Sequence, residues 1–240
     1  MGTAGQQDVT ARQRPERVQL FATCLGDLAL PDAVADAEAL LREAGFEVEF
    51  PAGQVCCGQP AFNAGHRRAA RRVARAFARA FRRDLPIVMP SGSCAGMVSH
   101  YLPELLGVEP FEAWELSAFL VEQGFEPRRR NEGAVLSYHD SCHMLRELGI
   151  RDAPRRLLEQ SGATIRALPR PDLCCGFGGT FSVRQPEISL ALADDKLAGS
   201  APVLVTADPG CLVQLRGRAA RAGGAHVVHI ATALARGVEA

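Results

Sequence analysis

The stretch Val55-Cys56-Cys57-Gly58-Gln59-Pro60 has a counterpart further along the chain in Leu173-Cys174-Cys175-Gly176-Phe177-Gly178. The cysteines around the two pairs are spaced alike, and the second set of four follows the first by 118, 118, 118 and 117 residues. With cysteine at about one position in thirty, four such matches arise by chance about once in a million trials. The sequence therefore predicts an internal duplication. The first set is Cys24, Cys56, Cys57 and Cys94, and the second is Cys142, Cys174, Cys175 and Cys211.

Hydrophobic patterning around the cysteines predicts alternating strands and helices. Each cysteine or cysteine pair follows an apolar or alternating run typical of a strand. The expected strands are Val18–Thr23, Phe46–Phe50, Pro86–Met89, Ala134–Tyr138, Ala163–Leu168 and Pro202–Thr206. Helical periodicity with start and stop signals favours helices over Asp32–Ala44, His66–Asp84, Ala113–Val121, Pro154–Gln160 and Pro186–Leu197. This order predicts an α/β fold of two duplicated parallel-sheet halves, residues 17–126 and 133–238, with helices on both faces of each sheet.

The same topology predicts where the cysteines meet. In an open parallel sheet, ligands bind in the crevice beyond the carboxyl ends of the strands. Each half would bring four thiols to this edge, and four soft thiolates suit Zn²⁺ or an iron–sulfur cluster. Adjacent cysteines reach different irons of a cluster more easily than one tetrahedral zinc ion, whose sites favour C-x₂₋₄-C spacing. An iron–sulfur centre is therefore favoured, most simply [4Fe–4S] with one or two per chain, and zinc or a thiol/disulfide role remains open.

Composition narrows the classes of function. The chain has 240 residues with 27 basic and 27 acidic side chains, which argues against a nucleic-acid binder driven by bulk charge. The N-terminal sequence has no apolar segment typical of a secretory signal, and no apolar run is long enough to span a bilayer. We therefore expect a cytoplasmic protein, in which cysteines more often bind metals or act in catalysis than form disulfides.

Two other motifs carry weaker signals. His139, Asp140 and His143 flank Cys142, and the favoured interpretation is a loop histidine before a helix capped by Asp140 or Ser141. The alternative is that His139 or His143 donates a proton or a hydrogen bond to a cluster sulfur. The run Gly176–Gly179 lacks the Lys-Ser/Thr of a phosphate-binding loop, so no nucleotide is expected.

The longer motifs resemble a known family. Cys56–Gly65, Pro90–Cys94 and Cys174–Val183 are similar to the cysteine-rich, CCG-motif iron–sulfur domains found in heterodisulfide reductase and in the iron–sulfur component of glycolate oxidase, and most of all to the lactate utilization protein A family. The resemblance covers about residues 18–236. It implies an iron–sulfur electron-transfer subunit of a multi-component system that oxidises L-lactate to pyruvate. The alternatives are a heterodisulfide-reductase-like thiol/disulfide subunit and a non-enzymatic zinc-binding scaffold.

The chain departs from that family in two places. The fuller family pattern ends each half with C-x-x-C, but Ser91 and Asp208 stand at the first of these positions. Four cysteines per half still suffice for a cubane cluster, with Ser91 or Asp208 as weak oxygen ligands. The chain also lacks the C-x₂-C-x₂-C-x₃-C run of ferredoxins. We therefore expect partner subunits that include a ferredoxin-type iron–sulfur protein, and no activity of this chain alone.

Overall fold

Two parallel four-stranded sheets, one per half, form the centre of the protein. The structure, a computed structural model, describes residues 14–238, so most of the N-terminal residues on which the expectation of no secretory signal rests lie outside it. The first sheet has the order β2-β1-β3-β4 and the second the equivalent order β6-β5-β7-β8. All their pairings are parallel, which confirms the predicted fold class. The strands are β1 (Arg17–Leu20), β2 (Glu47–Glu49), β3 (Ile87–Met89), β4 (Ala113–Glu115), β5 (Val135–His139), β6 (Thr164–Ile165), β7 (Val203–Thr206) and β8 (His226–His229).

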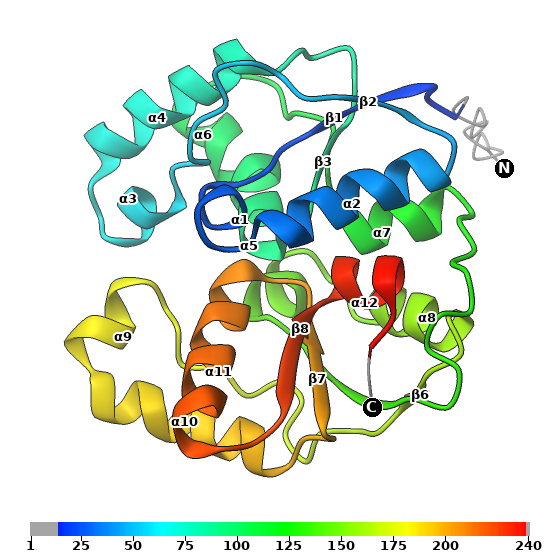
Figure 1. Cartoon of the computed structure of the whole chain (residues 1–240). Coiled ribbons are helices and arrows are strands. Elements are labelled where there is room, and N and C mark those ends of the chain that lie inside the picture. Colours follow the sequence, from blue (N-terminus) through cyan, green and yellow to red (C-terminus); the bar gives the residue numbers. More distant parts are fainter. Residues whose placement is uncertain (1–13, 239–240) are drawn as a thin grey trace, which may run out of the picture.

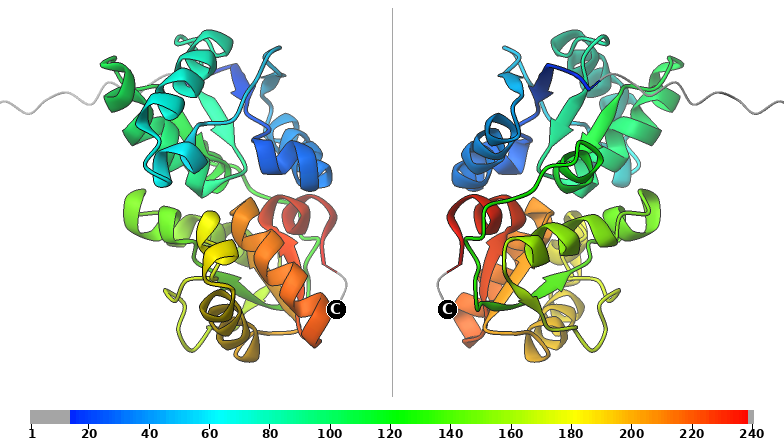
Figure 2. Two further views of the ribbon diagram at one scale, coloured as in Figure 1. Left: turned by 90° about the vertical axis from the view of Figure 1, so that its left-hand side faces the viewer. Right: turned by 90° about the vertical axis from the view of Figure 1, so that its right-hand side faces the viewer.

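Helices cover both faces of each sheet and connect its strands. Figure 1 shows the halves stacked one above the other, and the side views of Figure 2 show the same arrangement. In the first half the helices are α1 (Cys24–Ala29), α2 (Pro31–Glu43), α3 (Gln59–Asn63), α4 (Arg67–Ala80), α5 (Gly92–Gly96), the π-helix η1 (Met97–Tyr101), α6 (Leu102–Leu106) and α7 (Leu116–Glu122). In the second they are the π-helix η2 (His143–Glu147), α8 (Asp152–Gln160), α9 (Thr180–Arg184), α10 (Pro186–Ala198), α11 (Pro209–Ala222) and α12 (Ile230–Arg236).

The strands divide their side chains between two layers because successive residues point to opposite faces. In β3, Val88 faces a core that both halves share, whereas Ile87 and Met89 face the core under α4 and α6. The shared core contains buried residues of α2 and α7 from the first half and of α8 and α12 from the second. The two halves are therefore joined by one continuous hydrophobic core.

The helices with clear sequence signals form where they are predicted. Helix α2 begins at Pro31, whose fixed φ suits a first helical position, and buries Ala37, Leu40 and Leu41. The prediction over Ala113–Val121 is wrong at its start, because residues 113–115 form β4 and the helix begins at Leu116. Trp114 therefore lies in a strand and is only half-buried, paired in register with Val88.

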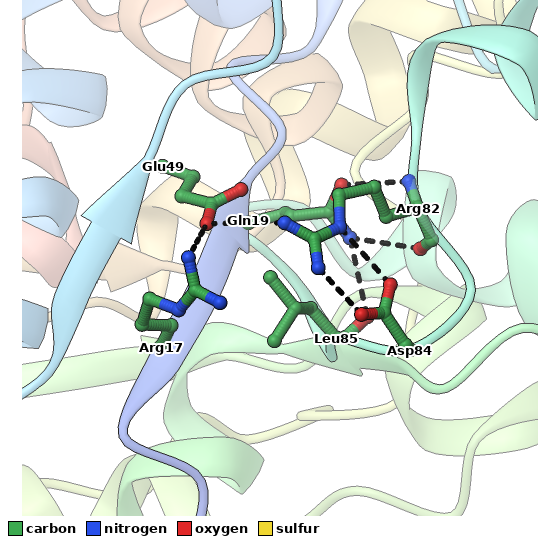
Figure 3. A network of polar contacts seen from close by, with 6 residues as sticks. All are labelled: Arg17, Gln19, Glu49, Arg82, Asp84 and Leu85. Carbon is green, nitrogen blue, oxygen red and sulfur yellow. Dashed lines mark hydrogen bonds and ion pairs between the residues drawn. The ribbon is translucent and has the colours of Figure 1, made fainter.

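A polar network fixes the first sheet at the edge where β3 begins, opposite the cysteines (Figure 3). The fully buried Gln19 donates to the carbonyl oxygens of Arg82 (2.9 Å) and Leu85 (3.2 Å) and accepts from the Arg82 amide (2.8 Å). Arg17 pairs with Glu49 on the neighbouring strand at 2.8 Å, and Arg82 pairs with Asp84. These contacts hold the α4–β3 loop against β1 and leave the opposite edge for the cysteines.

Candidate metal centre

The four cysteines of the first half come together at the carboxyl edge of the first sheet. We call Cys24, Cys56, Cys57 and Cys94 the first thiol cluster. The Sγ atoms of Cys24 and Cys56 are 3.7 Å apart, and those of Cys57 and Cys94 are 3.4 Å apart. The adjacent thiols of Cys56 and Cys57 also contact each other. The segments that follow β1, β2 and β3, which include the start of α1 and part of α5, thus bring the four sulfurs together, as the topology predicted.

The second half repeats this arrangement. We call Cys142, Cys174, Cys175 and Cys211 the second thiol cluster. The Sγ atoms of Cys175 and Cys211 are 3.0 Å apart, and the thiols of Cys142 and Cys174 are in contact. These cysteines follow β5, β6 and β7, the equivalents of β1, β2 and β3.

The glycine after each cysteine pair sets the local geometry. Gly58 and Gly176 have φ of 94° and 88°, a left-handed conformation that glycine adopts without steric cost. This turn aims the Gly58 amide at Cys56 Sγ (3.4 Å) and the Gly176 amide at Cys174 Sγ (3.3 Å). Each Cys-Cys-Gly motif therefore supplies two sulfurs and one backbone donor directed at a sulfur.

Each thiol cluster has one buried and one accessible side. Cys57, Cys94, Cys175 and Cys211 are buried, Cys24 is exposed, and Cys56, Cys142 and Cys174 are half-buried. All eight are free thiols. A group bound in either thiol cluster would thus contact two buried sulfurs on its inner side and have its outer side near solvent.

The thiols strongly perturb one another. The contact with Cys56 is the main cause that raises the pKa of Cys24, and the contact with Cys174 does the same for Cys142. Cys174 has its pKa lowered to about 2, mainly because the Cys142 thiol donates to it. A single thiolate within a thiol cluster is stabilised by hydrogen bonds from its protonated neighbours. Four thiolates at these distances would repel one another, so they need a cationic centre between them. The donor chemistry therefore fits a soft metal ion or an iron–sulfur cluster.

Both thiol clusters face the interface between the halves. Helix α1, which begins at Cys24, packs on α11, which carries Cys211; η2, which follows Cys142, packs on α5, which carries Cys94. Helix α1 is the equivalent of η2, and α5 is the equivalent of α11, so each half makes the same contact with the other. The halves are therefore related by a pseudo-two-fold axis. Between the clusters, the Ser93 amide donates to Asp208 Oδ2 at 2.7 Å, and Gln59 Nε2 lies 2.9 Å from His143 Nε2.

Ser91 and Asp208, which replace the first cysteine of each C-x-x-C, cap helices. Ser91 Oγ accepts from the Cys94 amide at 3.2 Å, and Asp208 Oδ1 accepts from the Gly210 amide at 3.1 Å. Both side chains are buried, and both oxygens of Asp208 already accept backbone N–H donors. Both residues thus have a structural role that the sequence alone did not indicate.

The residues around Cys142 differ in part from the favoured interpretation. Ser141 does cap the following helix, since its Oγ accepts from the Met144 amide at 3.3 Å. Asp140 instead binds Arg155 through two 2.7 Å hydrogen bonds. His139 is the last residue of β5 and fully buried, not a loop residue, and burial is the main cause that lowers its pKa to about 3. The sequence pattern therefore did not indicate that His139 is buried beside the second thiol cluster.

Two repeats that each bring a Cys-Cys-Gly motif and two further cysteines to a sheet edge define the class of protein. Residues 18–99 and 136–216 match the family described as "CCG: Cysteine-rich domain", and the chain belongs to this family. The part of the chain that the structure describes has no helix long and apolar enough to cross a membrane.

Comparison with individual proteins identifies the group within this class. The chain is 40% identical to "Lactate utilization protein A 2" of Bacillus cereus (strain Q1) over 241 residues, covering 92% of this chain and 99% of that protein. It is 38% identical to "Lactate utilization protein A" of Oceanobacillus iheyensis over 231 residues, covering 89% and 94%. The chain belongs to the lactate utilization protein A family. Among solved structures, a glutamate racemase from Thermus thermophilus covers 92% of this chain and 77% of its own at 15% identity, with a TM-score of 0.34 that supports no functional argument.

Proposed function

We propose that the chain is an electron-transfer subunit of a multi-component system that oxidises L-lactate to pyruvate. Each thiol cluster holds an iron–sulfur centre in this proposal, with all eight cysteines as ligands. The observation that carries it is the convergence of four free thiols in each half at the carboxyl edge of a sheet. Membership in the lactate utilization protein A family supplies the metabolic context.

The chemistry assigns distinct roles to the residues of the chain. Conversion of L-lactate to pyruvate releases two electrons and two protons, and a bound iron–sulfur centre supplies one-electron transfer. The amides of Gly58 and Gly176 donate to the Sγ atoms of Cys56 and Cys174. Hydrogen bonds to the cysteine ligands of an iron–sulfur centre favour its reduced state and so raise its reduction potential. The buried cysteines would hold each centre from the protein interior, and the exposed Cys24 would leave the first centre accessible to a partner.

Partner subunits are then needed to deliver electrons to these centres and to accept electrons from them. The chain has no ferredoxin-type cysteine run, so the centres that collect or pass on electrons belong to other chains. We propose that one partner is a ferredoxin-type iron–sulfur protein, that the complex is cytoplasmic, and that this chain has no lactate-oxidising activity alone.

Metal analysis of anaerobically purified protein tests this proposal. We expect a brown protein with iron and acid-labile sulfide in similar amounts and an EPR signal after reduction. Cys56→Ser and Cys174→Ser remove equivalent ligands of the two centres, so each is expected to lose the iron of one half. Ser93→Ala, which changes a neighbour of Cys94 without removing a thiol, is the control and should keep full iron content.

The outcomes separate the alternatives. Loss of iron in Cys174→Ser but not in Cys56→Ser would show that only the second half is loaded. A colourless protein with zinc and no sulfide would refute the electron-transfer role and favour a scaffold. Activity of the assembled complex with a dithiol/disulfide pair but not with lactate would favour the heterodisulfide-reductase-like alternative.

A further inference from the structure

His139 is a buried histidine whose ring has no hydrogen-bond partner. It ends β5, its side chain is fully buried, and neither Nδ1 nor Nε2 has a partner among residues 14–238. Burying an imidazole without satisfying its nitrogens is costly, and native proteins rarely retain such a group without a function. The free ring nitrogens therefore point to a ligand.

The ring is directed at the second thiol cluster. A ring nitrogen of His139 and the Sγ atoms of Cys175 and Cys211 all lie within 4.8 Å of one another. Both cysteines are buried, so the three donor atoms converge on the inner side of the second centre. Imidazole nitrogen and thiolate sulfur are a common ligand combination for iron and zinc.

The first half has no equivalent donor. The residue three positions before Cys24 is Phe21, as His139 is three positions before Cys142. The Phe21 ring packs edge-on against Phe77 and Phe81 at centroid distances of 5.1 and 5.4 Å, as an ordinary core residue. The same place in the duplicated fold thus holds a hydrocarbon ring in one half and an imidazole in the other.

We propose that His139 coordinates the metal of the second centre through a ring nitrogen. The second centre then has a mixed thiolate–imidazole ligand set, whereas the first is held by thiolates alone. This inference rests on the proposed function in taking the group to be an iron–sulfur centre. An imidazole nitrogen at only one of the two centres makes them chemically unequal, so we expect their reduction potentials to differ.

Pulsed EPR with isotope-labelled histidine tests the coordination directly. The chain is produced with either ¹⁴N- or ¹⁵N-histidine in otherwise unlabelled protein, purified anaerobically and reduced. We expect a strong nitrogen hyperfine coupling that changes with the histidine label. His139→Phe, which copies the residue of the first half, should lose this coupling while the signal of the first centre persists.

Two further variants keep the test decisive. His139→Cys replaces the imidazole with a thiol, and we expect it to retain iron, lose the histidine-dependent coupling and change the midpoint potential of the second centre in an EPR redox titration. His143→Gln removes the nearby half-buried histidine that contacts Gln59, and it should keep the coupling.

The results distinguish this inference from the proposed function. An iron–sulfur protein with no histidine-dependent coupling, or with a coupling that survives in His139→Cys, would overturn the assignment of His139 alone. A protein without iron would overturn the proposed function. X-ray absorption at the edge of the metal actually bound would then decide the role of His139: imidazole scattering that is lost in His139→Cys supports coordination, and its absence in the native protein refutes it.

Discussion

Asp208 joins the two halves beside the thiol clusters, and replacing it with asparagine tests how much this contact contributes to stability. The side chain is 4% exposed, caps α11 through Oδ1 and accepts the Ser93 amide of the other half through Oδ2 at 2.7 Å. In Asp208→Asn the amide oxygen can still accept from Gly210. The new amide group then faces the Ser93 N–H donor to donor, so the contact between the halves is lost.

The magnitude follows from this single lost contact. A hydrogen bond to a charged acceptor contributes about 1.5–3 kcal/mol, and the helix cap is retained. We therefore expect Asp208→Asn to lower the free energy of unfolding by about 2–3 kcal/mol. Ser91→Ala is the matched control, because Ser91 holds the equivalent position in the first half but caps only its own helix. That variant should lose about 1 kcal/mol, the usual contribution of an N-cap.

Urea unfolding of the metal-free proteins, followed by circular dichroism, measures both changes. Using metal-free protein separates the strength of the interface from metal affinity. The reasoning is refuted if Asp208→Asn costs no more than Ser91→Ala, because the contact with Ser93 would then contribute nothing beyond a helix cap.

Two further perturbations probe the surroundings of the clusters. Burial is the main cause that raises the pKa of Glu115 to about 7, so the folded state binds a proton that the unfolded state loses above the ordinary value of 4.5. The free energy of unfolding should therefore fall by about 3 kcal/mol between pH 4.5 and pH 8, and Glu115→Gln should abolish this part of the pH dependence. Urea unfolding of both proteins across this pH range measures the effect. The prediction is contradicted if the free energy of unfolding depends on pH in the same way in both proteins. At Gly176 an added Cβ would lie 2.2 Å from the Ser189 carbonyl oxygen, whereas at Gly58 the nearest atom is 3.5 Å away. Gly58→Ala should thus cost about 1–2 kcal/mol for its positive φ and Gly176→Ala about 3 kcal/mol or more, and equal costs in thermal unfolding would show that the clash is relieved without penalty.

Much of the fold was predictable because the duplication gives each sequence signal twice. Apolar strand runs, the proline at the start of α2 and the positions of the cysteines indicated three strands of each sheet and the helices α2, α4, α8 and α10, but α11 was not predicted. The fourth strands, β4 and β8, were missed because each runs directly into a helix, so no turn signal separates strand from helix. Glu115 and His229, the last residues of these strands, cap the helices that follow with their own side chains. A strand–helix boundary that is made by a capping side chain, with apolar residues on both sides, does not change the hydrophobic periodicity enough to be detected from the sequence.

The convergence of the thiols was also predictable, but the polar contacts around them were not. Parallel strands bring their carboxyl ends to one edge, so the placement of cysteines after strands sufficed for each cluster. The contact between Ser93 and Asp208 depends on how one half packs on the other, which spacing within a half does not specify. His139 was misjudged for a related reason: residues next to a loop cysteine look exposed in the sequence, but β5 extends to His139 and carries it into the core.

The positions at which the halves differ show what the duplication has kept and what it has changed. Both halves keep four cysteines and the left-handed glycine, the features needed to assemble a thiol cluster. They differ at Phe21 and His139 and at Ser91 and Asp208, which adjoin the clusters without altering the number of thiols. The second half thereby gains an imidazole directed at its sulfurs and a carboxylate that binds the first half. If the proposed iron–sulfur centres are bound, these differences act on their relative potentials and on the interface between them. Under the proposed ligation, an imidazole at only one of the two centres would give them different reduction potentials, which two identical centres would not have.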